Sequence, residues 1–296
     1  MPPSLRHPHA IAARAALLAL STIGAVEARA AEPAPLPCGL VAEPPRAVVD
    51  VVDGDTVTLD DGSTLRLLGT LPPKPPITSP EPERWPPADA SKAALAALLT
   101  GASIEIAPAG HARDRYGRRR AHAFLTRDGA RMWVAAHLLA EGHARYYGLA
   151  GEAPCADELL AIEDTARTRG AGLWANATYA VRSAGHTSEL MRLRSTFQLV
   201  EGRIARLGRS QGRIYLNFGP DWRTDFTVGI SSRLAGADAG WLSRLAALEG
   251  ARVRVRGWIE RRNGPYIELE APALLEVLEP APDRAAEERA DRPRSP

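Results

Sequence analysis

The 296-residue chain is long enough for about two domains, and its 37 basic and 35 acidic side chains nearly balance, giving a formal net charge of +2. So small a net charge indicates no partner by itself, and only local clusters of charge can argue for one. An apolar content of 45% with charge spread along the chain excludes wholesale disorder, collagen-like repeats and a multi-span membrane protein.

The first 30 residues have the order of a secretory signal. Basic residues up to Arg14 precede an apolar run over 15–26, and small residues follow up to Ala30. The run is shorter than the roughly 20 apolar residues that span a bilayer, which favours cleavage over a membrane anchor. We therefore expect a signal at 1–30, a Pro-rich tether at 31–45, no membrane span, and export to the periplasm or the medium.

The chain has two cysteines, Cys38 and Cys155. A disulfide between them can persist in the oxidising compartment that an exported protein meets. Two unpaired, buried thiols are the alternative.

Residues 46–176 have the pattern of a first domain, in which a β-meander is followed by helices. The turn residues at 60–63 predict a hairpin, and the proline-rich segment 70–87 predicts an exposed loop. Apolar spacing predicts strands at 47–52, 55–60, 64–69, 103–106 and 121–126, and helices at 88–99, 132–140 and 156–169.

A linker at 177–194 separates this domain from a second β-rich domain at 195–280, and a charged, Pro-rich tail at 281–296 is expected to be disordered. In the second domain, three strands, a helix and two strands follow one another, which is the order of an OB-type barrel. The expected strands are 198–205, 213–218, 224–230, 252–259 and 266–270, with the helix at 240–248.

Three spaced motifs carry the most information about function. They are Val51-Val52-Asp53-Gly54-Asp55-Thr56, Leu65-Arg66-Leu67-Leu68 and Asp114-Arg115-Tyr116-Gly117-Arg118, with Gly172-Leu173-Trp174 closing the region. At these residues the chain resembles the staphylococcal-nuclease-like (thermonuclease) family over about 46–175. The resemblance implies a five-stranded OB barrel with packed helices, so that the whole chain is expected to be mainly β (α+β) with two OB-type barrels.

The resemblance also implies chemistry, because members of the family are Ca²⁺-dependent phosphodiesterases that act on DNA and RNA. Asp55 matches a carboxylate that ligates the metal, and Arg66 and Arg118 match the arginines that grip the scissile phosphate. A hard divalent cation prefers carboxylate oxygen, and planar guanidinium groups pair bidentately with phosphate oxygens.

The sequence departs from the family pattern at 70–74. Leu71 stands where the family has its second calcium carboxylate, and Lys74 stands where it has the glutamate that acts as general base. Leucine cannot ligate a cation, and a lysine ammonium repels the metal and cannot accept a proton. We therefore expect a domain that binds nucleic acid while hydrolysis and calcium binding are weak or lost, and Lys74 can add a third cation to the grip on phosphate.

An active metal-dependent nuclease is the first alternative. Glu81 or Glu83 could replace the missing acids, and Asp53 and Asp114 lie near Asp55 by motif logic. The competing interpretation is that these acids only solvate a loop and its turns.

Basic side chains gather at two further places. Five arginines stand against one acid between Arg113 and Arg120, which predicts a phosphate-tracking patch that includes Arg113, Arg115, Arg119 and Arg120. In the second domain Arg254 and Arg256 alternate with valines, which predicts a basic strand face that could bind nucleic acid beside stacking aromatics. Docking of a protein or of an envelope glycan on this second barrel is the other alternative.

Overall fold

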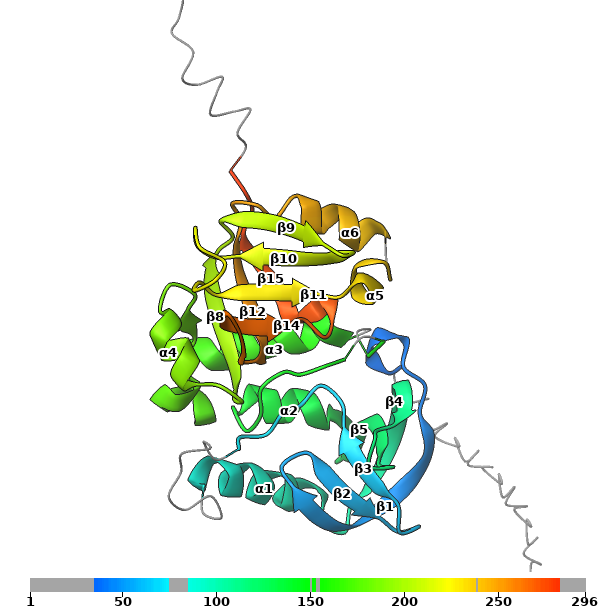
Figure 1. Cartoon of the computed structure of the whole chain (residues 1–296). Coiled ribbons are helices and arrows are strands. Elements are labelled where there is room, and N and C mark those ends of the chain that lie inside the picture. The colour runs from blue at the N-terminus through cyan, green and yellow to red at the C-terminus, as the bar shows by residue number, and fades with distance from the viewer. Residues whose placement is uncertain (1–34, 75–84, 150, 153–154, 238, 283–296) are drawn as a thin grey trace, which may run out of the picture. The chain divides into compact units, whose positions relative to one another are not determined.

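The computed structural model describes residues 35–74, 85–149, 151–152, 155–237 and 239–282, and it is a mixed α+β fold with two β units (Figure 1). The expected signal at 1–30 and nearly all of the expected tail lie outside these ranges. No helix among the described residues is long and apolar enough to cross a membrane.

The first unit is built on a closed barrel of five strands. Its sheet has the order β3-β2-β1-β4-β5-β6, and a parallel pairing of β3 with β5 closes it. The expected hairpin turn is present, with Gly62 at φ +77° and Leu59 N–H donating to Ser63 O at 2.9 Å. The strands are β1 (Glu43–Asp53), β2 (Thr56–Leu59), β3 (Thr64–Leu67), β4 (Ser103–Arg113), β5 (Arg119–Arg127) and β6 (Ala130–Trp133).

Three helices accompany this barrel: α1 (Pro86–Leu99), α2 (Val134–Ala140) and α3 (Ala156–Thr168). The alternating apolar residues of the strands point inward, so that Val57 and Ile104 are fully buried. Leu95 and Leu99 of α1 and Leu159 of α3 complete the same core. The barrel implied by the resemblance and the helices expected from apolar spacing are thus present, although β4 runs on to Arg113 where a strand at 103–106 was expected.

The segment expected to be a tether is partly ordered. Pro37–Gly39 forms a short 3₁₀ helix, η1, and β1 begins at Glu43. Cys38 of η1 is joined to Cys155, just before α3, by a disulfide with Cα atoms 5.5 Å apart. The predicted disulfide is therefore confirmed, and it ties the start of the ordered chain to the last helix of the first unit.

The second unit consists of two sheets. One has the order β13-β14-β11-β10-β9 and the other β15-β12-β8-β7, and no strand pairing closes them into a single barrel in the described part of the chain. The strands are β7 (Arg182–Ser183), β8 (Phe197–Arg203), β9 (Arg206–Ser210), β10 (Arg213–Asn217), β11 (Thr227–Ile230), β12 (Arg252–Trp258), β13 (Glu260–Arg262), β14 (Gly264–Glu268) and β15 (Leu275–Glu279). The helices are α4 (Thr187–Arg192), α5 (Ser232–Ala235) and α6 (Ala239–Ala246).

The segment 177–194, expected to be a linker, has structure of its own. It holds a 3₁₀ turn, η4 (Ala177–Tyr179), the strand β7 and the helix α4, and β7 pairs in parallel with β8. Leu190 of α4 is fully buried. This segment therefore belongs to the packed second unit.

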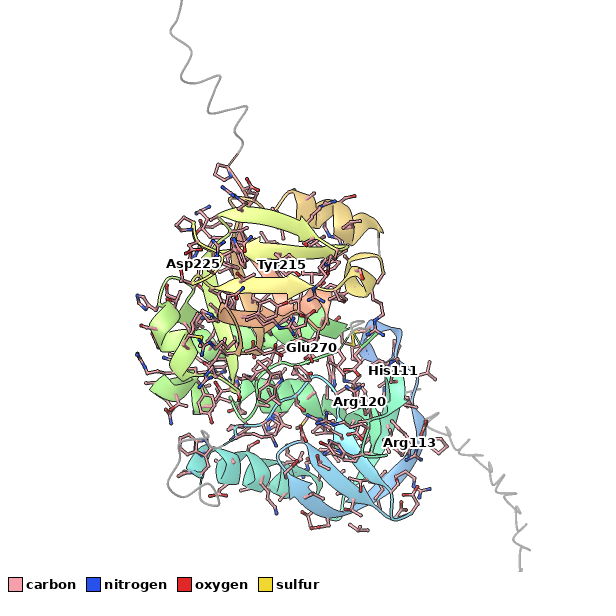
Figure 2. The ribbon with its side chains drawn as sticks, viewed as in Figure 1. His111, Arg113, Arg120, Tyr215, Asp225 and Glu270 are labelled. Atoms are coloured by element: carbon pink, nitrogen blue, oxygen red, sulfur yellow. A yellow bond between two sulfur atoms is a disulfide. The ribbon has the colours of Figure 1, made fainter. Side chains whose placement is uncertain are left out.

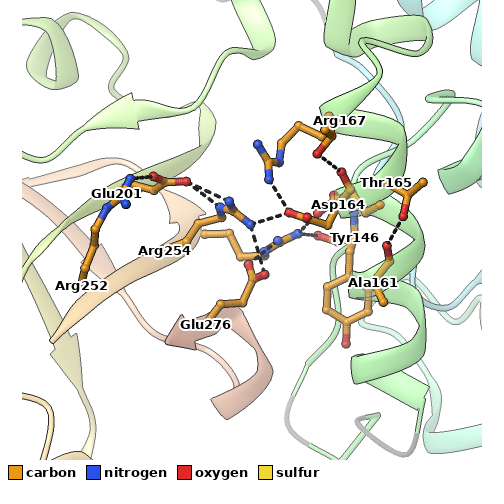
Figure 3. A network of polar contacts seen from close by, with 12 residues as sticks. Tyr146, Ala161, Asp164, Thr165, Arg167, Glu201, Arg252, Arg254 and Glu276 are labelled. Carbon is orange, nitrogen blue, oxygen red and sulfur yellow. Dashed lines mark hydrogen bonds and ion pairs between the residues drawn. The ribbon is translucent and has the colours of Figure 1, made fainter. Parts of the chain in front are cut away.

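A network of ion pairs joins the two units between α3 and β12 (Figure 3). Arg256 is 1% exposed and pairs with Glu163 of α3 at 2.6 Å and with Glu276 of β15 at 2.5 Å. Arg254 is 6% exposed and pairs with Glu201, Asp164 and Glu276. The basic strand face expected at Arg254 and Arg256 is thus not exposed as a binding surface, because α3 packs on it and acids of α3, β8 and β15 pair with both arginines.

Candidate functional site

The tight turn between β1 and β2 carries the Asp-Gly-Asp motif. The residues on either side of the turn, Asp53 and Thr56, face one another in the ladder, and the Asp55 N–H donates to Asp53 Oδ1 at 3.0 Å. Gly54 has no room for a side chain, because a Cβ there would lie 2.2 Å from Ser91 Oγ of α1 and 2.7 Å from Pro72 Cβ. The glycine therefore lets the turn press against α1 and directs Asp55 inward.

Asp55 is 2% exposed, and both of its carboxylate oxygens are engaged. Thr56 Oγ1 donates to Oδ1 at 2.6 Å, and Arg66 Nε donates to Oδ2 at 3.3 Å. Burial, with a smaller effect of neighbouring Asp53, outweighs the charge of Arg66 and raises the pKa of Asp55 to about 6. Asp55 is thus mostly ionised at neutral pH and holds the Arg66 guanidinium by its Nε.

Arg118 is held in the same way by a different acid. In the turn between β4 and β5, Asp114 accepts the N–H groups of Tyr116 and Arg118 and the Nε of Arg118, the last at 2.7 Å. Burial would raise the pKa of Asp114, but these hydrogen bonds outweigh it and lower the pKa. Asp114 is therefore a structural acid that orients Arg118.

Strand register places Arg66 beside the start of β5, which Arg118 precedes in the chain. Arg66 pairs with Arg120 in the parallel ladder of β3 and β5, and Arg118 lies two positions before Arg120. Because side chains alternate along a strand, Arg66 projects to the side opposite the core, whereas Arg118 belongs to the turn that leads into β5. Among the described residues no protein group accepts from their Nη nitrogens, and their side chains are 25% and 23% exposed. Four N–H donors on each guanidinium remain for a ligand.

Leu71 is packed between the two units. It is 3% exposed and forms an apolar cluster with Phe197 and Leu199 of β8. Its backbone makes an isolated bridge with Arg145, in which Leu71 N–H donates to Arg145 O at 2.7 Å. Leu71, which stands where the family has its second calcium carboxylate, therefore makes an apolar contact with the second unit.

Lys74 is exposed, and its positive charge acts on Asp53. Burial would raise the pKa of Asp53, but hydrogen bonds from Asp55 and Thr56 and the charge of Lys74 outweigh it, so the pKa is lowered. Glu81 and Glu83, expected as substitutes for the missing acids, lie outside the described residues.

The acids that the structure describes here do not fit a calcium ion. Ca²⁺ takes six to eight oxygen ligands, whereas both oxygens of Asp55 are already bonded to protein donors and Leu71 supplies none. Within the described ranges no group of three or more His, Cys, Asp or Glu side chains could hold a metal ion. We therefore derive no chemical step through a metal.

The expected basic patch is divided by the structure. Arg113 and Arg115 are exposed and hydrogen-bond only within their own turn, to Gly117 O at 2.6 Å and Tyr116 Oη at 2.8 Å. Arg119 pairs with Glu43 of β1, and Arg120 is 8% exposed and pairs with Glu152. Figure 2 labels Arg113 and Arg120 near this hairpin. The sequence interpretation is therefore corrected at Arg120, which does not belong to a surface patch because its side chain is buried.

Two residues beside the site had no signal in the sequence. Burial, assisted by a hydrogen bond to Glu270, raises the pKa of Tyr147, while the charge of Arg66 acts in the opposite direction. Tyr147 Oη donates to Glu270 Oε2 at 2.6 Å. An acid that follows β14 of the second unit therefore contacts a tyrosine that follows α2 of the first unit.

Comparison with known proteins agrees with this geometry. Residues 66–176 match the family model of staphylococcal nuclease homologues. None of the curated proteins matches the chain. The chain thus carries a domain of this family, and the resemblance is confirmed over these residues, whereas the motif at 51–56 lies before them.

Proposed function

We propose that this staphylococcal nuclease homologue domain binds nucleic acid through Arg66 and Arg118 and cleaves it weakly or not at all. A nuclease-like phosphodiesterase or a nucleic-acid binder is what the family suggests. The finer assignment is supported above all by the burial of Leu71 against Phe197 and Leu199. The phosphate-gripping half of the site keeps free donors, whereas the metal-binding half has been turned into a packing contact.

The binding step follows from hydrogen-bond geometry. Asp55 and Asp114 fix the two guanidinium groups by Nε, so that little side-chain freedom is lost when a phosphate binds to the Nη nitrogens. The exposed ring of Tyr116, with Arg118 5.3 Å from its centroid, offers a stacking surface for a base beside the phosphate. Arg113, Arg115 and Arg119 add positive charge around this turn.

Weak hydrolysis follows from the groups that are missing. A positioned general base contributes about 10²- to 10⁴-fold to a rate. Lys74 stands at the position of the family's general-base glutamate, and no carboxylate among the described residues takes its place. Export is part of the same proposal, because a disulfide persists in an oxidising compartment and the apolar run near the N-terminus has the order of a secretory signal.

The decisive experiment measures binding and cleavage of one labelled single-stranded oligonucleotide by the secreted protein, with calcium and with chelator. We expect binding in both conditions, and about a tenfold loss of affinity in Arg66→Gln and in Arg118→Gln because each removes a charged phosphate contact. Arg127→Gln, which changes an exposed arginine at the far end of β5, is the matched control.

Two outcomes would replace the proposal. Rapid calcium-stimulated cleavage that is lost in a Glu81→Gln, Glu83→Gln double variant would establish an active enzyme with a rebuilt site. Absence of oligonucleotide binding, with a correctly folded protein, would favour a module that contacts protein or glycan through its β units.

A further inference from the structure

A pocket of about 240 Å³ lies between the residues that follow β3 of the first unit and the second unit. Leu71 and Lys74 line one side, and the segment that enters β8 lines the other. Three aromatic side chains also line it: Tyr179 of η4, Phe197 of β8 and Trp258 of β12. Drug-sized ligands occupy pockets of roughly 300 Å³ or more, so this one suits a ligand of mononucleotide size or smaller.

Arg145 makes this pocket unusual. It is 6% exposed, donates from Nη1 to Phe197 O at 2.7 Å, and lies 4.9 Å and 5.1 Å from the ring centroids of Phe197 and Tyr179. Its Nε has no hydrogen-bond partner, and it forms no ion pair with any carboxylate that the structure describes. Burial lowers its pKa to about 10, which leaves the guanidinium charged at neutral pH.

The other buried arginines are treated differently by this fold. Arg120 pairs with Glu152, Arg254 with Glu201 and Arg256 with Glu163. A buried charge without a counter-ion is costly, and contacts with aromatic faces offset only part of that cost. The guanidinium of Arg145 lines the pocket without a counter-ion, and an anionic ligand bound there would supply one.

Two further features indicate what kind of anion fits. Lys74 brings a second positive charge to the same pocket and forms no ion pair within the described residues. Trp258 is 38% exposed and meets Phe197 edge to face, with ring centroids 5.8 Å apart. A pocket lined by both cations and aromatic rings suits a ligand that joins an anionic group to a flat ring.

We propose that this pocket binds a mononucleotide unit, whose phosphate monoester meets Arg145 and Lys74 and whose base lies against Trp258. The unit can be a free mononucleotide or the 5′-phosphorylated end of a strand, since both present the same chemistry. Neither Arg66 nor Arg118 lines the pocket, so this proposal does not depend on the proposed function.

The first test is calorimetric titration of the full secreted protein with 5′-AMP, adenosine and inorganic phosphate. We expect 5′-AMP to bind at least tenfold more tightly than either half of the molecule, because only it uses both the cations and the rings of the pocket. Adenosine binding as tightly as 5′-AMP would overturn the proposal, and so would the absence of binding by 5′-AMP.

Variants locate the binding. Lys74→Ala and Trp258→Ala should each weaken 5′-AMP binding about tenfold, whereas Lys92→Ala on exposed α1 and Trp222→Ala on the second unit are the matched controls. Arg66→Gln should leave 5′-AMP binding unchanged, which separates this pocket from the proposed phosphodiester face. Arg145→Lys tests the buried cation itself, with the melting temperature recorded to show that it folds. Unchanged binding in both Lys74→Ala and Trp258→Ala would place the ligand elsewhere and refute the proposal.

The source of the unit is decided with two oligonucleotides that differ only in a 5′-phosphate. If the phosphorylated strand binds more tightly and loses that advantage in Trp258→Ala, the pocket takes strand ends. If the strands bind alike while 5′-AMP still depends on Trp258, it takes free mononucleotides.

Discussion

Strands β3 and β12 both set arginines among apolar residues, yet their guanidinium groups have different fates. Arg66 on β3 is held by one carboxylate at Nε and keeps its Nη donors toward solvent. Arg256 on β12 is 1% exposed and has carboxylates at both Nη nitrogens. Alternation along a strand thus tells which face carries the charge, whereas the elements packed on that face decide whether the charge binds a ligand or holds the fold together.

The largest effect on stability is expected for a substitution of the buried arginine on β12. Replacing Arg256 with Met leaves Glu163 buried without its partner, and removal of one member of a buried pair costs about 3–5 kcal/mol. Arg252→Met, at a side chain that is 44% exposed, should cost much less, because solvent screens its ion pairs. Urea denaturation measures both. Equal losses for the two variants would show that the network contributes no more than surface pairs do.

A smaller effect is the pH dependence of stability that a buried histidine gives to the first unit. His122 of the first barrel is 1% exposed, and burial lowers its pKa from 6.5 to about 4. The unfolded chain therefore takes up a proton below pH 6.5 while the folded chain does not. The contribution of neutral His122 to stability is present above pH 6.5 and is lost as the pH falls toward 4, by about 3 kcal/mol in total.

This pH dependence is checked by denaturation at pH 7 and pH 4.5. Wild-type protein should lose more stability between these values than His122→Gln, whose side chain can still accept a hydrogen bond from Trp133 Nε1. His111→Gln, at an exposed histidine, is the control and should behave as wild type does. An identical loss in the wild type and both variants would contradict a buried neutral imidazole.

The smallest effect concerns salt. Each phosphate contact adds about 0.7 to the slope of log affinity against log salt for a single strand. Arg66→Gln should therefore reduce the slope of oligonucleotide binding by about that amount, whereas Arg252→Gln should not change it. A reduced slope in Arg252→Gln would move part of the nucleic-acid surface to the second unit.

Much of the first unit could be predicted from sequence, because its signals are local. Alternating apolar residues and the Asp60–Ser63 turn fix the meander, and the spacing of Asp55, Arg66 and Arg118 identifies the family. The second unit was harder. The sequence pattern does not predict strands β9, β13 and β15. They are short, and their charged side chains do not alternate with buried ones.

The site was only half visible for a related reason. The absence of an acid at Leu71 can be seen in the sequence, but its burial against Phe197 depends on a contact between residues 126 positions apart in the chain. The same holds for Arg254 and Arg256, which each pair with an acid of α3 in the other unit, and for the Arg145 Nε, which has no hydrogen-bond partner. Long-range packing decides all three, and no periodic pattern records it.

The helix α3 has a consequence for how the protein can be dissected. Leu159 belongs to the core of the first unit, while Glu163 and Asp164 two turns or less away hold arginines of the second. A fragment that ends at residue 176 would take Arg256 away from Glu163 and uncover Leu71, and a fragment that begins there would leave Arg256 with Glu276 alone. We accordingly expect the two β units to unfold together rather than one after the other.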